Sequence, residues 1–390
     1  MRFFILCALL VCSMAVQTNS LATSARMSPR VVPQPQLDIT SSLVVNGYTR
    51  TYVYTVSPLA APAAGRPLVI HLHGDGGNMN LSTAWKHAVL QDPNGAVLLS
   101  AQGRNNIPAA AAIDESAWRF RMDEAGAPYD DIDFIAQIIT RATTGTSLLG
   151  TAINPDQIYV VGESRGAGFA YFLYADPRTS NAIRAIVPIS GTFYCAGEAT
   201  AEGTPGTPAR AGSDLTCGEI SQFGYWGPKA SLFTAPNVRR APHILDIHGQ
   251  LSPDGSEFPQ TAPPALDRDY QSSQWAGWGD AAGCYTVRVS TQTVQTLAQP
   301  IGGRQVRTYA YSQTAQNLAT RCAGLDLEFY VVQGGGHVPG GFEPTAWCFL
   351  STIGGTPSTS ACPSSVTPTP VTPTPEPSSY RQFLPITRQR

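Results

Sequence analysis

The stretch QIYVVGESRGAGFAYFLYA (157–175) joins two kinds of secondary structure across a short glycine-containing turn. Its first half is mostly apolar and rich in β-branched residues, which is typical of a buried strand, and the residues after Arg165 favour a helix. Between the halves, Gly162, Ser164 and Gly166 form a G-x-S-x-G pentad. Because this pentad follows a strand and precedes a helix, it predicts a tight turn that holds the Ser164 hydroxyl outward.

Similar short apolar runs recur on both sides of the pentad and indicate further buried strands. Residues 130–144 have isoleucines at helical spacing, and Asn46-Gly47 separates two strand-like runs in an expected antiparallel hairpin. Strands that alternate with helices predict an α/β protein with a mostly parallel, doubly wound sheet, helices on both faces and ligands at the carboxyl ends of the strands. The remaining expected strands are 66–74, 96–103, 183–191, 241–249 and 325–337.

A serine hydroxyl needs a neighbouring base, and in strand–turn–helix serine hydrolases the order along the chain is serine, acid, histidine. Three histidines follow Ser164. His243 opens an apolar strand and His248 closes it, whereas His337 follows three glycines after the last apolar run. We therefore predict that Ser164 is a nucleophile and His337 its general base.

The acid that orients the histidine is expected just after the strand that ends at His248-Gly249. Asp254 is the best placed carboxylate in the loop there. Glu257 and Asp246 are the alternatives, and Asp246, which lies within the strand, also has an interpretation as a buried core carboxylate. We predict Asp254 as the third member of the catalytic triad.

Acyl transfer also requires backbone N–H groups that face the developing oxyanion. The N–H of Arg165, directly after the nucleophile, is one candidate, and the N–H of Asp75, in the turn His73-Gly74-Asp75-Gly76-Gly77-Asn78, is the other. The alternative interpretation of this segment is a glycine-rich tight turn. The Arg165 guanidinium is a candidate for recognising a carboxylate on the substrate, and the alternative is a solvated charge at a helix start.

These motifs occur in the same order as in the extracellular polyhydroxybutyrate depolymerase and feruloyl esterase group of the α/β-hydrolase superfamily, which the chain resembles over 44–349. The resemblance implies an α/β-hydrolase fold, Ser164 and His337 as catalytic residues, an oxyanion turn after His73-Gly74, and a disulfide between Cys284 and Cys322. The segments that carry it are HLHGDGGN (71–78), DDIDFI (130–135), IYVVGESRGAG (158–168), IHG (247–249), WGDAAGC (278–284) and GGGHVPG (334–340).

The chain departs from this group at three positions near the expected site. Ser252 stands where the group has its acid, so Asp254 requires a loop two residues longer. Arg165 stands where alanine is common, and Pro339 where a tryptophan is usual. The last two changes concern the substrate cleft, so the substrate of the group does not transfer directly.

The two ends of the chain predict export and a tail. Residues 1–25 have the basic start and apolar run of a signal peptide, so we expect a secreted protein. Residues 38–362 form the expected catalytic domain, within which 196–233 is a candidate lid loop. A Pro/Thr-rich linker (363–379) and a C-terminal tail (380–390) follow, and the tail is either a cell-surface anchor or a frayed end.

Composition excludes several classes of partner. The formal net charge of −2 gives no electrostatic reason to expect nucleic acid or an anionic membrane. No transmembrane segment is expected, because the apolar run near the N-terminus is shorter than the roughly 20 residues that a spanning helix needs. Acyl transfer by a serine needs no cofactor, and no metal site is expected because the cysteines lack CxxC or CxxH spacing. The six cysteines left after removal of the signal peptide are expected to form disulfides, with sequence neighbours paired, in an oxidising compartment. They are Cys195, Cys217, Cys284, Cys322, Cys348 and Cys362.

Carboxylic ester hydrolysis through an acyl-enzyme is the leading hypothesis, with a small or polymeric ester as substrate. A serine peptidase is the alternative within enzymes, because the same triad serves both reactions. A non-catalytic cell-surface binding protein on the same fold is the alternative outside them, with Ser252 as its main argument. The sequence leaves the oligomeric state open.

Overall fold

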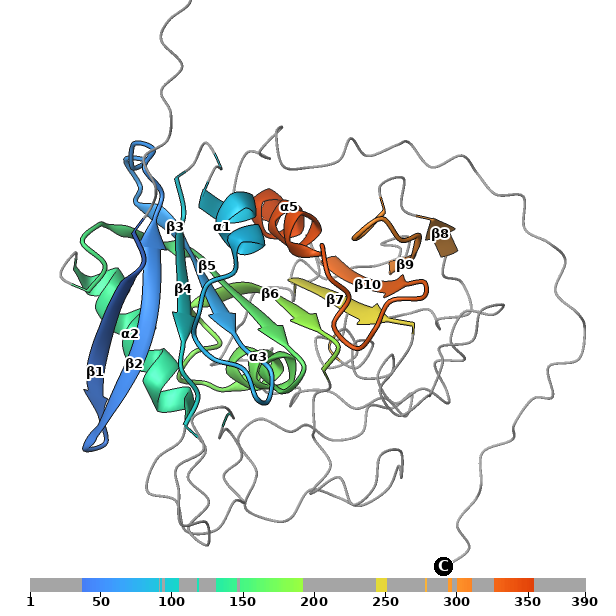
Figure 1. Ribbon diagram of the computed structural model, residues 1–390. Coiled ribbons are helices and arrows are strands. Elements are labelled where there is room, and N and C mark those ends of the chain that lie inside the picture. The colour runs from blue at the N-terminus through green and yellow to red at the C-terminus, as the bar shows by residue number, and fades with distance from the viewer. Residues whose placement is uncertain are drawn as a thin grey trace, which may run out of the picture. The chain divides into compact units, whose positions relative to one another are not determined.

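One sheet organises the part of the chain that the structure describes (Figure 1). This computed structural model describes residues 37–90, 92, 95–104, 118, 131–145, 148–191, 243–250, 278, 294–296, 300–310 and 326–353, all within one compact unit, Gln36–Arg390. In this part of the chain, strands hydrogen-bond in the order β1-β2-β4-β3-β5-β6-β7-β10-β9-β8. The strands are β1 (Ile39–Val45), β2 (Tyr48–Val56), β3 (Arg66–Leu72), β4 (Val97–Ala101), β5 (Ile153–Glu163), β6 (Ile183–Ile189), β7 (His243–Gly249), β8 (Val294–Thr296), β9 (Val306–Ala310) and β10 (Asp326–Val332).

The centre of the sheet is parallel and its two margins are antiparallel. From β4 through β3, β5, β6 and β7 to β10, each strand runs parallel to the next. The strands β1 and β2 at one margin, and β9 and β8 at the other, pair antiparallel with their neighbours. The prediction of a mostly parallel sheet entered by an antiparallel hairpin is therefore confirmed, whereas β8 and β9 were not predicted from the sequence.

The hairpin that enters the sheet turns at Asn46-Gly47. Both residues have positive φ, 50° for Asn46 and 83° for Gly47, and Val45 pairs with Tyr48. Type I′ turns require positive φ at both central residues, and Asn-Gly meets this requirement at little steric cost. The local sequence thus fixes both the turn and the register of β1 against β2.

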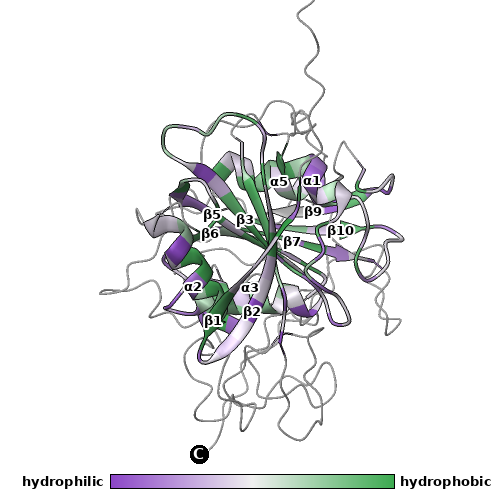
Figure 2. Ribbon diagram, turned by 60° about the vertical axis from the view of Figure 1, so that its left-hand side comes forward, coloured by the Kyte–Doolittle hydropathy of each residue, from purple (hydrophilic) through white to green (hydrophobic). Residues whose placement is uncertain are grey.

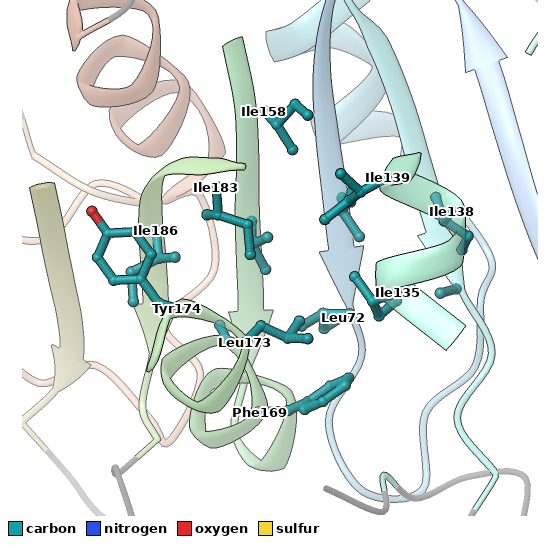
Figure 3. Close-up of a cluster of buried hydrophobic side chains, with 14 of the residues drawn as sticks. Leu72, Ile135, Ile138, Ile139, Ile158, Phe169, Leu173, Tyr174, Ile183 and Ile186 are labelled. Carbon is teal, nitrogen blue, oxygen red and sulfur yellow. The ribbon is translucent and has the colours of Figure 1, made fainter. Parts of the chain in front are cut away.

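The central strands are buried on both faces, which explains their nearly continuous apolar runs. Along β3, Leu68, Ile70 and Leu72 pack into a cluster with α2 and α3, and Val69 packs into a second cluster with α1 and α5 on the opposite face. Figure 3 shows the first cluster, where Leu72 lies near side chains of both helices. The helices are α1 (Thr83–Leu90), α2 (Asp131–Thr144), α3 (Arg165–Ala175) and α5 (Glu343–Ile353).

Helix α2 illustrates how a sequence pattern produces one of these layers. Ile132, Ile135 and Ile138 are buried, and hydrophobic and hydrophilic segments alternate along the ribbon in Figure 2. At its first residue, the buried Asp131 carboxylate pairs with the buried Arg50 guanidinium on β2. None of the helices in the described part of the chain combines the length and apolar character that crossing a bilayer requires.

The parallel strands bring the predicted site residues to one edge of the sheet. β3, β5, β7 and β10 run in the same direction and end at Leu72, Glu163, Gly249 and Val332. The turn after β3, the pentad after β5 and the histidine loop after β10 therefore emerge at the same edge, where open α/β sheets bind their ligands.

Candidate active site

Ser164 occupies a strained turn between β5 and α3. Its φ of 53° and ψ of −118° lie in a region that residues with a Cβ seldom adopt. A Cβ on Gly162 would lie 2.0 Å from the carbonyl oxygen of Gly166, and one on Gly166 would lie 2.3 Å from that of Leu72. Both glycines are required because the backbone of the turn passes so close to itself and to β3.

This turn, at the end of the central strand of a sheet with order β1-β2-β4-β3-β5-β6, decides the fold. The chain has the α/β-hydrolase fold. The fold class expected from the sequence is thereby confirmed, and with it the helices on both faces of the sheet.

The structure brings Ser164 and His337 into hydrogen-bond distance. The His337 Nε2 atom lies 2.8 Å from the Ser164 Oγ atom, across 173 residues of sequence. The Ser164 side chain makes no capping hydrogen bond to α3, although it precedes the first helical residue. Its hydroxyl is thus directed to the imidazole rather than to the helix, the arrangement that nucleophilic catalysis by serine requires.

The loop that carries His337 is held by the end of β7. The backbone N–H of Gln250 donates to the Val332 carbonyl oxygen (2.9 Å), and the Gly334 N–H donates to the Gln250 Oε1 atom (2.7 Å). A Cβ on Gly249 would lie 1.7 Å from the Gly336 carbonyl oxygen, so the two loops are in backbone contact. The largely buried Gln250 therefore connects the loop after β7 to the histidine loop, a role that the sequence analysis did not predict.

The predicted oxyanion turn lies close to Ser164. A Cβ on Gly74 would lie 3.2 Å from the Ser164 Cβ atom, and the Gly77 N–H closes the turn by donating to the Gly74 carbonyl oxygen at 3.0 Å. Gly76 has a positive φ of 74° that suits this tight turn. Asp75 thus sits within the turn beside Ser164, and Arg165 follows Ser164 as the first residue of α3.

The His73 side chain holds this turn in place through hydrogen bonds. The Gly103 N–H donates to the His73 Nε2 atom (3.1 Å), so Nε2 is an acceptor and the hydrogen lies on Nδ1, which donates to the Gly74 carbonyl oxygen (2.8 Å). Gln102 supports the far end of the same segment by accepting a hydrogen bond from the Met79 N–H at its Oε1 atom (3.0 Å). The buried imidazole therefore fixes the backbone at Gly74 through a defined tautomer.

Trp118 connects the oxyanion turn to Arg165. Its indole Nε1–H donates to the His73 carbonyl oxygen (2.6 Å), and its own carbonyl oxygen accepts a hydrogen bond from the Arg165 Nε atom (2.9 Å). The Arg165 Nε atom also lies 3.6 Å from the Asp75 Oδ1 atom. The Arg165 guanidinium, expected to meet either substrate or solvent, thus contacts protein groups of Trp118 and Asp75. The part played by Trp118 was not predicted from the sequence.

The pentad residue Glu163 belongs to a group of polar and ionisable side chains at the ends of β3, β4 and β5. Glu163 Oε1 is 3.1 Å from His71 Nε2, and His71 Nδ1 is 3.1 Å from Ser100 Oγ. Burial raises the pKa of Glu163, but hydrogen bonding and charge from His71 outweigh it and hold that pKa below its usual value. Burial, helped by the nearby charge of Glu163, raises the pKa of Glu343 at the start of α5.

The triad acid has one candidate among the described residues. Asp246 is buried in β7, where its Oδ2 atom accepts a hydrogen bond from the Tyr171 hydroxyl (2.5 Å) and its Oδ1 atom lies 2.7 Å from His248 Nε2. This carboxylate is engaged in the core between β7 and α3. Asp254 and Glu257 lie outside the described residues.

Of the six cysteines expected to form disulfides, Cys348 is described, on α5, and it is disulfide-bonded. The other five lie outside the described residues, as does the candidate lid loop 196–233, and the pairing stays a prediction. Within the described part of the chain, no group of three or more histidine, cysteine or acidic side chains is placed to hold a metal ion.

Comparison with known proteins gives similarities to solved structures alone. No protein-family model matches the sequence, and no curated protein sequence is similar to it. An acetyl xylan esterase from Aspergillus awamori is similar with a TM-score of 0.44 and 15% identity over 77% of this chain and 95% of that chain. An arylesterase gives a TM-score of 0.40 and 13% identity over 82% of each chain.

Esterases recur among the solved structures that are similar to this chain, including a thermostable esterase and a second acetyl xylan esterase, from Paenibacillus sp. R4. A puromycin-hydrolyzing peptidase from Mycobacterium tuberculosis is also similar, with a TM-score of 0.42 and 13% identity over 83% of this chain and 41% of that chain. At such identities and TM-scores the similarity assigns no activity to this chain, and the functional argument depends on its own site.

Proposed function

We propose that the protein is a secreted serine hydrolase that cleaves carboxylic esters through an acyl-enzyme. The observation that carries the proposal is the 2.8 Å distance between Ser164 Oγ and His337 Nε2, with Ser164 on a strained strand-to-helix turn. Structural serines seldom combine a positive φ, a glycine on either side in the pentad and an imidazole at this distance. The pair is the nucleophile and base of an acyl transfer.

In the first half of the reaction, His337 Nε2 accepts the Ser164 hydroxyl proton while Oγ attacks the ester carbonyl carbon. Asp254 orients the imidazole and stabilises its protonated form. The carbonyl π electrons move to oxygen, and the N–H groups of Asp75 and Arg165 bind the resulting oxyanion. The position of the turn supports this role, because a Cβ on Gly74 would lie only 3.2 Å from the Ser164 Cβ atom, so the turn passes beside Ser164.

The oxyanion electrons then re-form the carbonyl as the bond to the leaving oxygen breaks, and His337 gives its proton to that oxygen, so an alcohol departs and the acyl group stays on Ser164. Water then attacks the acyl carbon while His337 accepts one of its protons. Return of that proton to Ser164 Oγ releases a carboxylic acid and restores the enzyme. His337 is exposed, which suits its need to exchange protons with both the leaving group and water.

The resemblance to polyhydroxybutyrate depolymerases and feruloyl esterases supports a hydroxyalkanoate or aromatic ester as substrate. The near-neutral net charge of −2 fits an uncharged ester, small or polymeric. Arg165 and Pro339 distinguish this chain's cleft from that group, so its substrate is a variation on theirs. The apolar segment within residues 1–25 supports export.

The test is hydrolysis by purified protein lacking residues 1–25. The panel contains p-nitrophenyl acetate and butyrate, methyl ferulate, hydroxybutyrate oligomers and a peptide amide, each measured with wild type and Ser164→Ala. We expect ester turnover that Ser164→Ala abolishes, together with labelling of wild type by a fluorophosphonate. Faster cleavage of the amide than of every ester would indicate a peptidase. A folded wild type that neither labels nor cleaves any ester would refute the proposal.

A further inference from the structure

The two proposed oxyanion donors lie on segments far apart in the sequence, so something must fix the distance between them. The Asp75 amide belongs to the turn after β3, and the Arg165 amide begins α3. Oxyanion stabilisation depends on donors that are held in place before the reaction, and an error of about 1 Å costs roughly 100-fold in rate. The side chains of these same two residues face each other, with Arg165 Nε 3.6 Å from Asp75 Oδ1.

We propose that the Arg165 side chain is a positioning residue that couples the two oxyanion donors through Asp75 and Trp118. This inference rests on the proposed function and assigns a new role to the guanidinium within it. Three contacts form the connection: Arg165 Nε donates to the Trp118 carbonyl oxygen at 2.9 Å, Trp118 Nε1 donates to the His73 carbonyl oxygen at 2.6 Å, and Arg165 faces Asp75. Together these contacts join the start of α3 to the turn after β3.

Trp118 is suited to carry the stiffer part of this connection. It is fully buried, and its ring lies between His73 at 4.7 Å and Phe169 of α3 at 4.9 Å, measured between ring centroids. Its ring thus contacts both segments while its indole N–H and carbonyl oxygen bind them. Any shift of α3 relative to the turn would have to break a buried hydrogen bond or separate these rings.

The ion pair is the weaker part, because the side chains of Arg165 and Asp75 are 28% and 56% exposed. Exposed ion pairs are screened by solvent and salt. Loss of the Asp75 charge should therefore have a smaller effect than loss of the Arg165 side chain, which removes both the ion pair and the hydrogen bond to Trp118. This order of effects separates the positioning role from a simple surface charge pair.

The test compares Arg165→Met, Arg165→Lys, Asp75→Asn and the double variant Asp75→Asn/Arg165→Met. A matched control is Lys86→Met, which breaks the exposed Lys86–Asp38 ion pair (2.5 Å) on α1, away from the pentad. Measurements are kcat and KM for a neutral ester and for an ester with a carboxylate tail, the thermal unfolding midpoint, and affinity for a boronic acid that forms a tetrahedral adduct with serine.

We expect Arg165→Met to lower kcat and boronic acid affinity about tenfold or more, with KM changed less than about twofold. Asp75→Asn should cause a smaller loss, and the double variant should equal Arg165→Met because both changes break one connection. In about 1 M salt, wild-type kcat should fall to that of Asp75→Asn, whose own kcat should stay unchanged. Lys86→Met should keep wild-type kinetics.

Wild-type kcat in both Arg165→Met and Asp75→Asn would overturn the inference while leaving the esterase proposal intact. A rise in KM confined to the ester with a carboxylate tail would also overturn it, and would assign the guanidinium to substrate recognition. If Arg165→Met does not fold, Asp75→Asn and the salt dependence of wild type decide the question. Absence of ester turnover by wild type would instead count against the proposed function.

Discussion

Replacement of Gln250 by leucine should reduce activity far more than stability. The substitution keeps the approximate volume of a largely buried side chain but removes the Oε1 atom that accepts the Gly334 N–H hydrogen bond at 2.7 Å. One intramolecular hydrogen bond contributes about 0.5–1.5 kcal/mol, so the free energy of unfolding should fall by about 1 kcal/mol. The loop that carries His337 would lose this attachment to β7.

The expected loss in kcat/KM is larger, because a displacement of about 1 Å in a reacting group costs roughly 100-fold in rate. The assay is hydrolysis of p-nitrophenyl acetate alongside urea unfolding. Gln157→Leu is the matched control, since it removes an acceptor for the Asn154 side-chain amide (3.0 Å) near the start of β5, at the other end of that strand from Ser164. Equal activity in the two variants would refute a positioning role for Gln250.

Three further predictions concern the supports of the site. Gly162→Ala would place a Cβ 2.0 Å from the Gly166 carbonyl oxygen, so thermal unfolding should show a loss of about 1–3 kcal/mol and ester hydrolysis should collapse. Burial raises the pKa of Glu343 above 4.5, so the folded state binds its proton more tightly than the unfolded state and loses stability as the pH rises through the raised pKa. The urea midpoint of Glu343→Gln should lack this decline, and parallel pH profiles in the two proteins would contradict it. Tyr171→Phe removes the hydrogen bond to the buried Asp246 carboxylate (2.5 Å). The free energy of unfolding should fall by about 1.5–3 kcal/mol. An unchanged free energy of unfolding would show that this hydrogen bond makes no net contribution to stability.

The sequence predicted those features that depend on neighbouring residues. The hairpin at Asn46-Gly47 and the turn at Ser164 follow from local backbone requirements, which glycine and asparagine satisfy in recognisable patterns. The helix α2 follows from the spacing of its isoleucines, since one apolar stripe must face the sheet. In each case the residues that determine the local structure lie close together in the sequence.

The features that the sequence did not predict depend on contacts between distant segments. Trp118 contacts His73 and Arg165 from a different part of the chain, and nothing in its own surroundings distinguishes it from a core tryptophan. Gln250 acts through a side-chain hydrogen bond 84 residues away, at Gly334. A single sequence contains no signal that relates such distant residues. These contacts are recognised in the structure, where the parallel strands bring the two segments together.

The separation in sequence between the proposed nucleophile and its base has a consequence for how the protein folds. Ser164 follows β5 and His337 follows β10, with β6 and β7 between those strands in the sheet, and the two residues are 173 positions apart in the sequence. Contacts of such high sequence separation require large loops to close and therefore form slowly. In a refolding experiment, the helix α2 and the hairpin at Asn46-Gly47, which depend on neighbouring residues, should therefore form before hydrolysis returns. The return of hydrolysis thus reports on long-range pairing between β5 and β10 rather than on local structure.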